Sequence, residues 1–420
     1  MAIPPNAVSV TLALGSSAPY QRILASRLLS AGMLRRVLVP GLFLEVQDPS
    51  PDGSLQVIKT FPANKLLNRV MWGTWARWPA KIRPKPPMMV TGWLSDWLLS
   101  HWIEPCSIFH ACTGFCLAGL HAAKRQGAVT LVDIGTRHPR AWRQSAIEEC
   151  RRFGVRDQEG AAMLPEILLR RMDREFETCD HILVPSNVSR QSFAERGLDG
   201  KTIVVPSGVD SEFFSVPSVP RSEKPLFRVC YVGRVQMAKG VAYLLQAWKR
   251  LALPHAELVL VGEVKPAAQS VLNSWADSSV RFTGILPPEE VAKIYRESDL
   301  FAFPSVSEGL AEVVLEAMAT GLPVVATDLS GANDCLKHGK EGLIIPARDV
   351  DAMADAILWC YQHRDESRAM GKAARARIES EFTLDHYTER QIALYRSLAG
   401  AGKVSAADGP IRPASAQAID

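Results

Sequence analysis

Short apolar runs without polar alternation are the sequence feature that most restricts the fold of this chain. Strands of this kind lie in parallel sheets that helices cover on both faces, so the pattern predicts an α/β fold. In a first series we expect strands at residues 8–14, 37–39, 129–134, 181–185 and 203–205, with helices at 21–30 and 165–178. In a second series we expect strands at 228–232, 257–261, 280–283, 300–304, 323–326 and 343–345, with helices at 242–251, 289–297, 312–320 and 351–363.

The two series predict two domains. A chain of 420 residues is too long for one ordinary hydrophobic core. Residues 215–225 hold three prolines and three serines, a composition typical of a linker. We therefore expect one doubly wound domain at 1–214, a second at 226–381, and a disordered tail at 400–420. Ligands of open α/β sheets bind at the carboxyl ends of the strands, so the cleft between the domains is the expected site.

Composition excludes several classes of protein. The formal charge of +4 comes from 48 basic and 44 acidic residues, which is too mild for nucleic acid as the main partner. No apolar run reaches the 18 residues of a membrane span, and the first 25 residues do not resemble a secretion signal. The eight cysteines form no CxxC pair and are expected to be buried thiols in a reducing cytosol.

The first segment with chemical content follows the strand expected at 228–232. Gly233 and Gly240 enclose Arg234 and Lys239 there, and Gly240 opens the next helix. A glycine lets the backbone approach a ligand closely, and a helix N-terminus attracts anions. Two flanking cations suit a diphosphate. A strand-to-helix turn with two surface cations is the alternative that this segment alone leaves open.

The second segment, residues 305–321, follows the strand expected at 300–304. Glu308 and Glu316 are eight residues apart, which in a helix corresponds to about 12 Å along the axis. That distance can place one carboxylate at each end of a nucleotide sugar, with free helix N–H groups between them. Periodicity alone also fits a plain amphipathic helix, with Leu310, Val313 and Val314 in its buried stripe.

Together these segments resemble the nucleotide-sugar domain of retaining glycosyltransferases with the GT-B fold, the large family that includes sucrose synthases and bacterial mannosyl and polysaccharide transferases. The resemblance spans residues 227–378 and also includes residues 281–284, 305–309 and 319–325. A weaker resemblance to exopolysaccharide-type members covers residues 132–214 and includes His138, Glu148, Glu149 and Asp180. It implies that the first half is the acceptor domain, and that a final helix near 382–398 crosses back onto it.

The resemblance implies roles for individual residues. Arg234 and Lys239 would hold the donor diphosphate, Glu316 the ribose hydroxyls, and Glu308 the hydroxyls of the donor sugar. Gly233 would lie in the diphosphate loop. The other implied donor contacts are the backbone N–H groups of Gly309, Leu310 and Ala311 and a base pocket at Gly284 and Ile285.

One catalytic role falls on the acceptor domain. The resemblance implies that His138 faces the transferred sugar and acts in catalysis with Glu308, Arg234 and Lys239. A loop histidine bonded to backbone is the alternative for His138.

The chain departs from the family pattern at two places. The loop after the first strand reads Gly15-Ser16-Ser17 instead of a double glycine, which puts the acceptor contacts of Gly15 and Ser16 in question. Asp334 stands where the family has a glutamate.

A competing metal motif must also be weighed. Asp349-Val350-Asp351 matches a D-x-D motif that binds a metal in another glycosyltransferase fold. Because it directly precedes an expected helix, we interpret it as a helix start. We therefore expect no metal and no cofactor.

The expected function follows from these assignments. The chain would move a hexose from a nucleotide diphosphate sugar to a glycan or lipid-linked acceptor with retention, in cell-surface polysaccharide or glycolipid assembly. A sugar-nucleotide epimerase of the same fold and a scaffold that only binds nucleotide sugar are the rival hypotheses. We expect a cytoplasmic protein that contacts the inner face of the membrane peripherally.

The membrane expectation comes from residues 65–102. Six of the ten tryptophans lie there among six lysines and arginines: Trp72, Trp75, Trp78, Trp93, Trp97, Trp102, Lys65, Arg69, Arg77, Lys81, Arg83 and Lys85. Tryptophan prefers the headgroup boundary and basic side chains are drawn to anionic lipid, so two short interfacial helices around a loop are expected. A core or sugar-platform role for the tryptophans remains the alternative.

Overall fold

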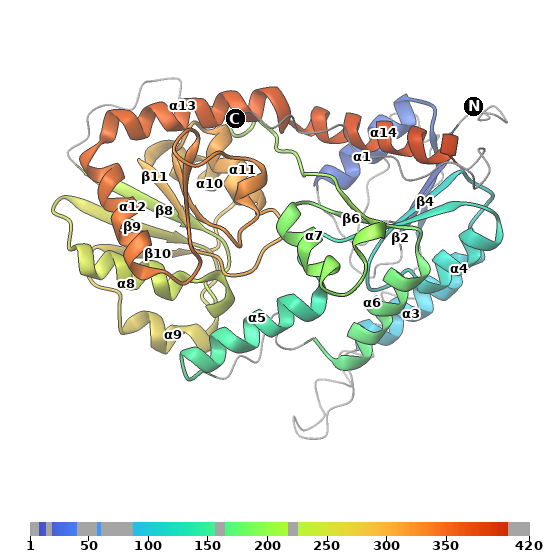
Figure 1. Ribbon diagram of the computed structural model, residues 1–420, viewed down its shortest axis with the longest axis horizontal. Coiled ribbons are helices and arrows are strands. Elements are labelled where there is room, and N and C mark those ends of the chain that lie inside the picture. The colour runs from blue at the N-terminus through green and yellow to red at the C-terminus, as the bar shows by residue number, and fades with distance from the viewer. Residues whose placement is uncertain are drawn as a thin grey trace.

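The fold consists of two parallel sheets with helices on their faces (Figure 1), in a computed structural model that describes residues 8–13, 19–39, 57–59, 87–155, 164–216 and 226–401. The first sheet has the order β3-β2-β1-β4-β5-β6-β7, and the second β10-β9-β8-β11-β12-β13. Every strand pair is parallel: Val10 of β1 pairs with Ile108 of β4, and Phe227 of β8 with Ala256 of β9. The expected α/β architecture of two doubly wound sheets is confirmed.

The strands follow the apolar runs closely. The first sheet contains β1 Val10–Ala13, β2 Leu34–Val39, β3 Val57–Lys59, β4 Ile108–Cys112, β5 Val129–Asp133, β6 His181–Val184 and β7 Thr202–Val204. The second contains β8 Phe227–Val232, β9 Ala256–Val261, β10 Val280–Gly284, β11 Leu300–Phe303, β12 Val324–Thr327 and β13 Gly342–Ile345. Strands β3 and β4 were not predicted.

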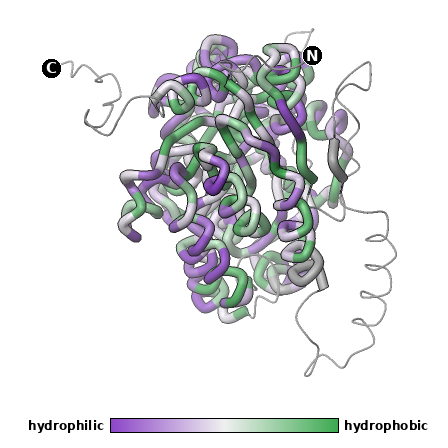
Figure 2. Tube along the Cα trace, turned by 90° about the vertical axis from the view of Figure 1, so that its right-hand side faces the viewer, coloured by the Kyte–Doolittle hydropathy of each residue, from purple (hydrophilic) through white to green (hydrophobic). Residues whose placement is uncertain are grey.

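The helices alternate with these strands. The first half contains α1 Pro19–Ser30, α3 Pro87–Ser100, α4 Leu117–Arg125, α5 Pro139–Arg152, α6 Glu166–Thr178 and α7 Asn187–Ala194. The second contains the short 3₁₀ helix η3 Met237–Lys239, α8 Val241–Leu251, α9 Pro266–Asn273, α10 Pro288–Glu297, α11 Glu312–Ala319, the 3₁₀ turn η4 Ala332–Asp334, α12 Val350–Gln362, α13 Arg364–Glu381 and α14 Leu384–Ala401. In Figure 2 the peripheral helices alternate between purple and green, as expected where one face is buried.

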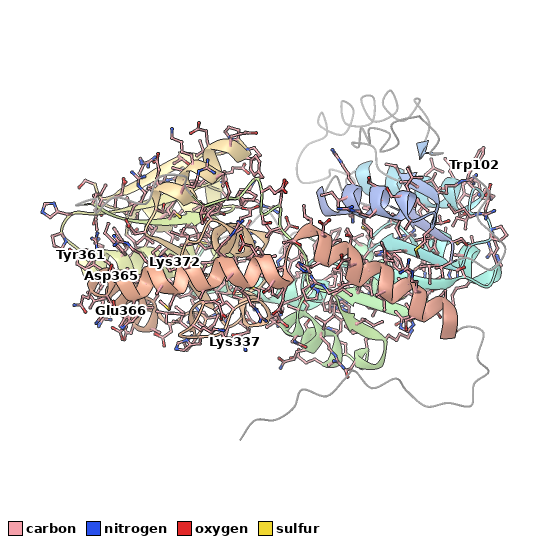
Figure 3. The ribbon with its side chains drawn as sticks, turned by 90° about the horizontal axis from the view of Figure 1, so that it is seen from above. Trp102, Lys337, Tyr361, Asp365, Glu366 and Lys372 are labelled. Atoms are coloured by element: carbon pink, nitrogen blue, oxygen red, sulfur yellow. The ribbon has the colours of Figure 1, made fainter. Side chains whose placement is uncertain are left out.

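Two apolar cores cover the first sheet. On one face Phe109 and Val132 pack with Phe176 of α6, and on the other Leu12 packs with Leu28 of α1. The second face also receives Tyr395 from α14. A C-terminal helix therefore crosses back onto the first half, as expected, and Figures 1 and 3 show α13 and α14 running end to end across both halves.

The chain passes between the two halves at two neighbouring points. Val209 donates its N–H to the carbonyl of Phe382 at 2.9 Å, and Leu384 donates to the carbonyl of Val209 at 3.1 Å. Gly208 leaves no room for a side chain there, because an added Cβ would lie 2.4 Å from the carbonyl oxygen of Thr383. The two crossings therefore form one tight joint beside the expected linker, whose residues 217–225 lie outside the described part of the chain.

Candidate active site

The loop between β8 and α8 has a shape that only glycine permits at two positions. Gly233 and Gly240 have φ angles of 145° and 67°. A Cβ on Gly240 would lie 2.0 Å from the carbonyl oxygen of Pro304, so the loop is pressed against the end of β11. The buried hydroxyl of Tyr231 donates to the carbonyl of Arg234 at 2.9 Å and fixes the backbone there. The Arg234 side chain is left exposed at the open end of the sheet.

The loop between β11 and α11 lies directly against the first one. Val306 donates its N–H to the carbonyl of Ala238 at 3.2 Å. Glu308 is only 9% exposed, and its Oε1 accepts from the Ser305 hydroxyl at 2.8 Å and forms an ion pair with Nζ of Lys239. The structure therefore brings together Lys239 and Glu308, which sequence reasoning had assigned to opposite parts of one donor.

Helix α11 begins beside this ion pair. Its N-cap residue Ala311 has no side chain that can cap it, so backbone N–H groups at the helix start are open to a ligand. Leu310 and Val314 are buried, as the amphipathic pattern predicts, and Ala311 is buried as well. Gly309 lies at the point where the loop meets the other half of the molecule.

Glu316 lies one turn further along α11 and is partly buried. Its Oε2 accepts a hydrogen bond of 3.0 Å from the Tyr295 hydroxyl. Burial raises the pKa of Glu316 from 4.5 to about 7. Gly284 ends β10 with a φ of 73°, and Ile285 after it is 76% exposed, an unusual exposure for a large apolar side chain. Among the described residues, no hydrogen bond or ion pair links Glu316 or Ile285 to Lys239 and Glu308.

The surroundings of His138 are those of a residue that stabilises the fold. His138 is 2% exposed and packs against the rings of Phe176 and Phe193, whose centroids lie 5.5 Å and 4.9 Å from its own. Its Nδ1 accepts from the backbone N–H of Arg140 at 3.2 Å and caps α5, and burial lowers the pKa of His138 to about 3. This geometry fits the backbone-bonded loop histidine better than a histidine that faces a sugar.

Polar contacts join the two halves around the site. The Ser186 hydroxyl donates to the carbonyl of Gly309 at 2.7 Å. Asp334, the acid that replaces the family glutamate, accepts from the backbone N–H of Asn187 at 3.1 Å. Sequence reasoning left Asp334 without a role and missed Asn187, because partners 147 positions apart share no local signal.

Helix α5 makes a second connection between the halves. Its Trp142 packs beside Ala238 of η3. The fully buried Glu149 accepts from the Tyr243 hydroxyl at 2.7 Å and from Nε of Arg348 at 2.6 Å. Glu149, which the sequence offers only as part of the family resemblance, therefore holds α5 against the second half of the molecule.

The D-x-D triplet starts a helix, as predicted. Asp349 Oδ1 accepts from the backbone N–H of Ala352 at 2.9 Å, and Asp351 pairs with Arg250. The described residues contain no group of three or more His, Cys, Asp or Glu side chains that could hold a metal ion. The predicted acceptor contacts Gly15 and Ser16 lie outside the described residues.

Comparison with known proteins finds a family match in the second half of the chain. Residues 227–363 match the model of the glycosyl transferases group 1. A D-inositol 3-phosphate glycosyltransferase of Corynebacterium urealyticum is 31% identical over 242 residues, which cover 52% of this chain and 57% of the relative. An amylovoran biosynthesis glycosyltransferase of Erwinia amylovora is 29% identical over 204 residues, 46% of this chain and 50% of the relative. The chain thus spans about half the length of the curated relatives it matches.

Solved structures share the fold over almost the whole chain. Sucrose-phosphate synthase from Thermosynechococcus elongatus aligns with a TM-score of 0.68 at 20% identity, over 94% of this chain and all of that one. HepE of Anabaena, solved in complex with UDP, aligns with a TM-score of 0.62 at 16% identity, over 93% of this chain and 99% of that one. Residues 227–363 therefore form a group 1 glycosyl transferase domain, in a chain that has the two-sheet fold of these solved structures.

Proposed function

We propose that the protein is a glycosyltransferase that moves a hexose from a nucleotide diphosphate sugar to a glycan or lipid-linked acceptor. The observation that carries the proposal is the cluster of Lys239, Ser305 and Glu308 at the uncapped start of α11. This cluster offers a cation, a hydroxyl, a carboxylate and free N–H groups to one small volume, which is what a sugar diphosphate needs. The names of the relatives support the same reaction class.

The proposed chemistry needs little covalent help from the protein. The bond between the anomeric carbon and the diphosphate oxygen breaks, and negative charge builds on the leaving group. Arg234, Lys239 and the N-terminus of α11 stabilise that charge. Glu308 orients the sugar hydroxyls and keeps Lys239 in place until the diphosphate arrives. The acceptor hydroxyl bonds to the anomeric carbon, and its proton passes to the departing phosphate.

Retention and independence from metals are part of the proposal. The family resemblance supports retention, with the acceptor attacking on the face that the diphosphate leaves. The roles of Asp349 as a helix cap and of Asp351 as the partner of Arg250 support a reaction without metal, because both carboxylates are occupied elsewhere.

A membrane-associated acceptor is supported by the outer face of α3. Within the described residues no helix is long and apolar enough to cross a bilayer. Four large apolar side chains of α3 and of the turn after it are nevertheless 38–57% exposed: Leu94, Trp97, Leu98 and Trp102. The one charged residue of α3, Asp96, is buried and points inward.

Charged side chains of α6 lie beside α3. A cavity of about 620 Å³ is lined by Trp93 of α3 and, among others, by three arginines and two acids of α6: Arg170, Arg171, Arg174, Asp173 and Glu177. An apolar stripe with tryptophans and flanking arginines fits an anionic lipid surface. We therefore propose peripheral contact with the cytoplasmic face of a membrane, in polysaccharide or glycolipid assembly.

Nucleoside diphosphate release tests the proposal. The purified chain is incubated with UDP-, GDP- and ADP-sugars, with and without candidate glycan and lipid-linked acceptors. Release that increases with acceptor, together with a product whose anomeric configuration matches the donor, supports a retaining transferase. A changed nucleotide sugar without release would indicate an epimerase, and binding without turnover of any donor would indicate a scaffold.

A further inference from the structure

Two loops from different halves of the molecule touch next to Glu308. A Cβ on Gly309 would lie 2.2 Å from the carbonyl oxygen of Gly135 and 2.8 Å from Cγ of Pro185. The first of these is a contact between two backbones, so the loop after β5 is pressed onto the loop that carries Glu308. Side chains of residues 136–138 are therefore held at the edge of the candidate donor site.

Arg137 lies in this contact with few partners. Its Nη1 donates to the Ser307 hydroxyl at 3.5 Å, which is at the outer limit of a hydrogen bond. Its Nε is buried and has no partner within the described part of the chain. No described carboxylate lies within ion-pair distance of Arg137. The more distant charges of Glu195 and Glu148 favour its charged form, and the charge of Arg348 disfavours it.

Several other arginines with a buried Nε have closer partners than Arg137. Arg390 donates to the backbone carbonyls of Glu381 and Pro206 at 2.7 Å and 3.1 Å, and three more arginines pair with carboxylates. Arg36 pairs with Glu104, Arg171 with Asp96 and Arg377 with Glu381. Arg137 lacks such a carboxylate, and burial lowers its pKa. A cation that is partly removed from water without a counter-ion destabilises the protein, unless a ligand supplies the negative charge.

The loop holds Arg137 in place on both sides. The Thr136 hydroxyl donates to the carbonyl of Arg137 at 3.0 Å, and the backbone N–H of His138 donates to the Ser192 hydroxyl at 2.8 Å. The His138 ring then caps α5. A guanidinium on a fixed backbone offers a rigid fork of donors, which matches a phosphate in two places at once.

We propose that Arg137 is an anion-binding residue of the first half, and that it takes a phosphate group of a substrate at the edge of the site formed by Arg234, Lys239 and Glu308. The inference rests on the proposed function. The phosphate belongs either to the donor diphosphate or to a phosphorylated acceptor, and the two sources share the chemistry that Arg137 recognises.

Binding of inorganic anions to the full chain tests this inference without turnover. Affinity for pyrophosphate is measured by calorimetry for the native chain, Arg137→Gln, Arg137→Lys and the matched control Arg151→Gln. Arg151 is an exposed residue near the end of α5, the helix that follows Arg137, so the control removes one charge from the same half of the molecule. A second titration adds inorganic phosphate to protein saturated with UDP, or with whichever nucleoside diphosphate stabilises the chain most.

We expect Arg137→Gln to weaken one of these affinities about 10-fold or more, with partial recovery in Arg137→Lys and no change in Arg151→Gln. If Arg137→Gln weakens pyrophosphate binding, Arg137 binds the donor diphosphate. If it weakens only the binding of phosphate to the nucleotide-saturated protein, Arg137 binds the phosphate of an acceptor. Affinities within twofold of the control in both titrations overturn the inference. Should Arg137→Gln not fold, the comparison of Arg137→Lys with the native chain decides in the same way, because lysine lacks the fork. If the native chain turns over no donor but Arg137→Gln still weakens anion binding, the proposed function fails and the anion site stands.

Discussion

Lys239 and Glu308 neutralise each other across two adjacent loops of the second sheet. Both were expected to contact the donor, one at the diphosphate and one at the sugar. In the structure each is the other's partner, with Ser305 completing the group. Among the two predicted diphosphate cations, Arg234 is therefore the exposed one, and Lys239 can reach a phosphate only by loosening or sharing its contact with Glu308.

This relationship separates the effects of removing the two cations. We expect Arg234→Ala to abolish transfer without changing stability, because its side chain is exposed. Lys239→Ala should abolish transfer and also lower the free energy of unfolding by about 1 kcal/mol, because it leaves a nearly buried carboxylate with only Ser305 as a partner. Transfer rates and urea unfolding measure both effects.

The exposed Lys337, which Figure 3 labels on the second half, provides the charge control. Lys337→Ala should behave as the native chain in both measurements. Native transfer rates in both Arg234→Ala and Lys239→Ala would show that the diphosphate assignment is wrong.

The second prediction concerns metals. Activity should survive a chelator such as EDTA, because the cations of the chain meet the donor charge. Asp349→Ala should leave activity unchanged and lower the free energy of unfolding by about 1 kcal/mol, the usual effect of losing an N-cap. Activity that disappears in chelator and returns with magnesium or manganese contradicts the reading of Asp349 as a cap alone.

The sequence predicted most strands because buried parallel strands carry an unbroken apolar signal. The sequence did not reveal β4, because the polar His110 interrupts its apolar run. In the structure the His110 ring is buried, and its Nδ1 forms a hydrogen bond of 2.6 Å with the Tyr395 hydroxyl. The sequence also missed α13, whose charged residues recur all along the helix and leave only a narrow buried stripe that ends at Ile378. Both elements are stabilised by residues that are distant in the sequence, and a local sequence pattern carries no information about such partners.

Only the site residues that closely follow a strand were predictable from the sequence. Lys239 and Glu308 follow β8 and β11, which are neighbours in the second sheet, so their side chains come together at one edge of that sheet. The burial of His138 depends on Phe176 and Phe193 from other helices. The contact of Arg137 with Ser307 depends on the relative position of the two halves, and no motif within one half predicts that position.

The third prediction uses the raised pKa of Glu316. Because burial raises this pKa from 4.5 to about 7, the folded state binds the proton more tightly than the unfolded state. The contribution of Glu316 to stability therefore falls as pH rises from 4.5 to 7, by about 3 kcal/mol at most for a shift of this size. Glu316→Gln should be more stable than the native chain at pH 8 and nearly equal to it at pH 4.5.

Donor affinity should change in the opposite direction. Ionised Glu316 is the better acceptor for ribose hydroxyls, so the donor KM of the native chain should fall as pH rises through about 7. Unfolding curves and donor KM values between pH 5 and 8 test both statements. The same pH dependence in Glu316→Gln would assign the titration to another group.

The fourth prediction concerns the closeness of the two loops. Gly309→Ala places a methyl group 2.2 Å from the carbonyl oxygen of Gly135, a distance at which the loops must separate. We expect a loss of stability of about 1–3 kcal/mol and a drop in transfer rate of at least 10-fold. Gly339→Ala is a control for strain without crowding, because its φ is 77° but no heavy atom lies within 4 Å of the added Cβ. Full activity in Gly309→Ala would mean that this contact is not needed for transfer.

The final prediction tests the exposed face of α3 with vesicles. Trp97 and Trp102 are 54% and 57% exposed, so neither fills a core, and Figure 3 places Trp102 at the outer edge of the first half. We expect the chain to co-sediment with anionic liposomes, less so as ionic strength rises, because flanking basic side chains share the attraction. The double variant Trp97→Ser and Trp102→Ser should lose most of this binding, since each indole that enters the headgroup region adds to it. Phe213→Ser, a change at a side chain that is 37% exposed elsewhere, is the matched control. Binding that is equal in the tryptophan variant and the control, or no binding to anionic vesicles at all, would leave α3 with another partner, such as an acceptor glycan that stacks on the indole rings.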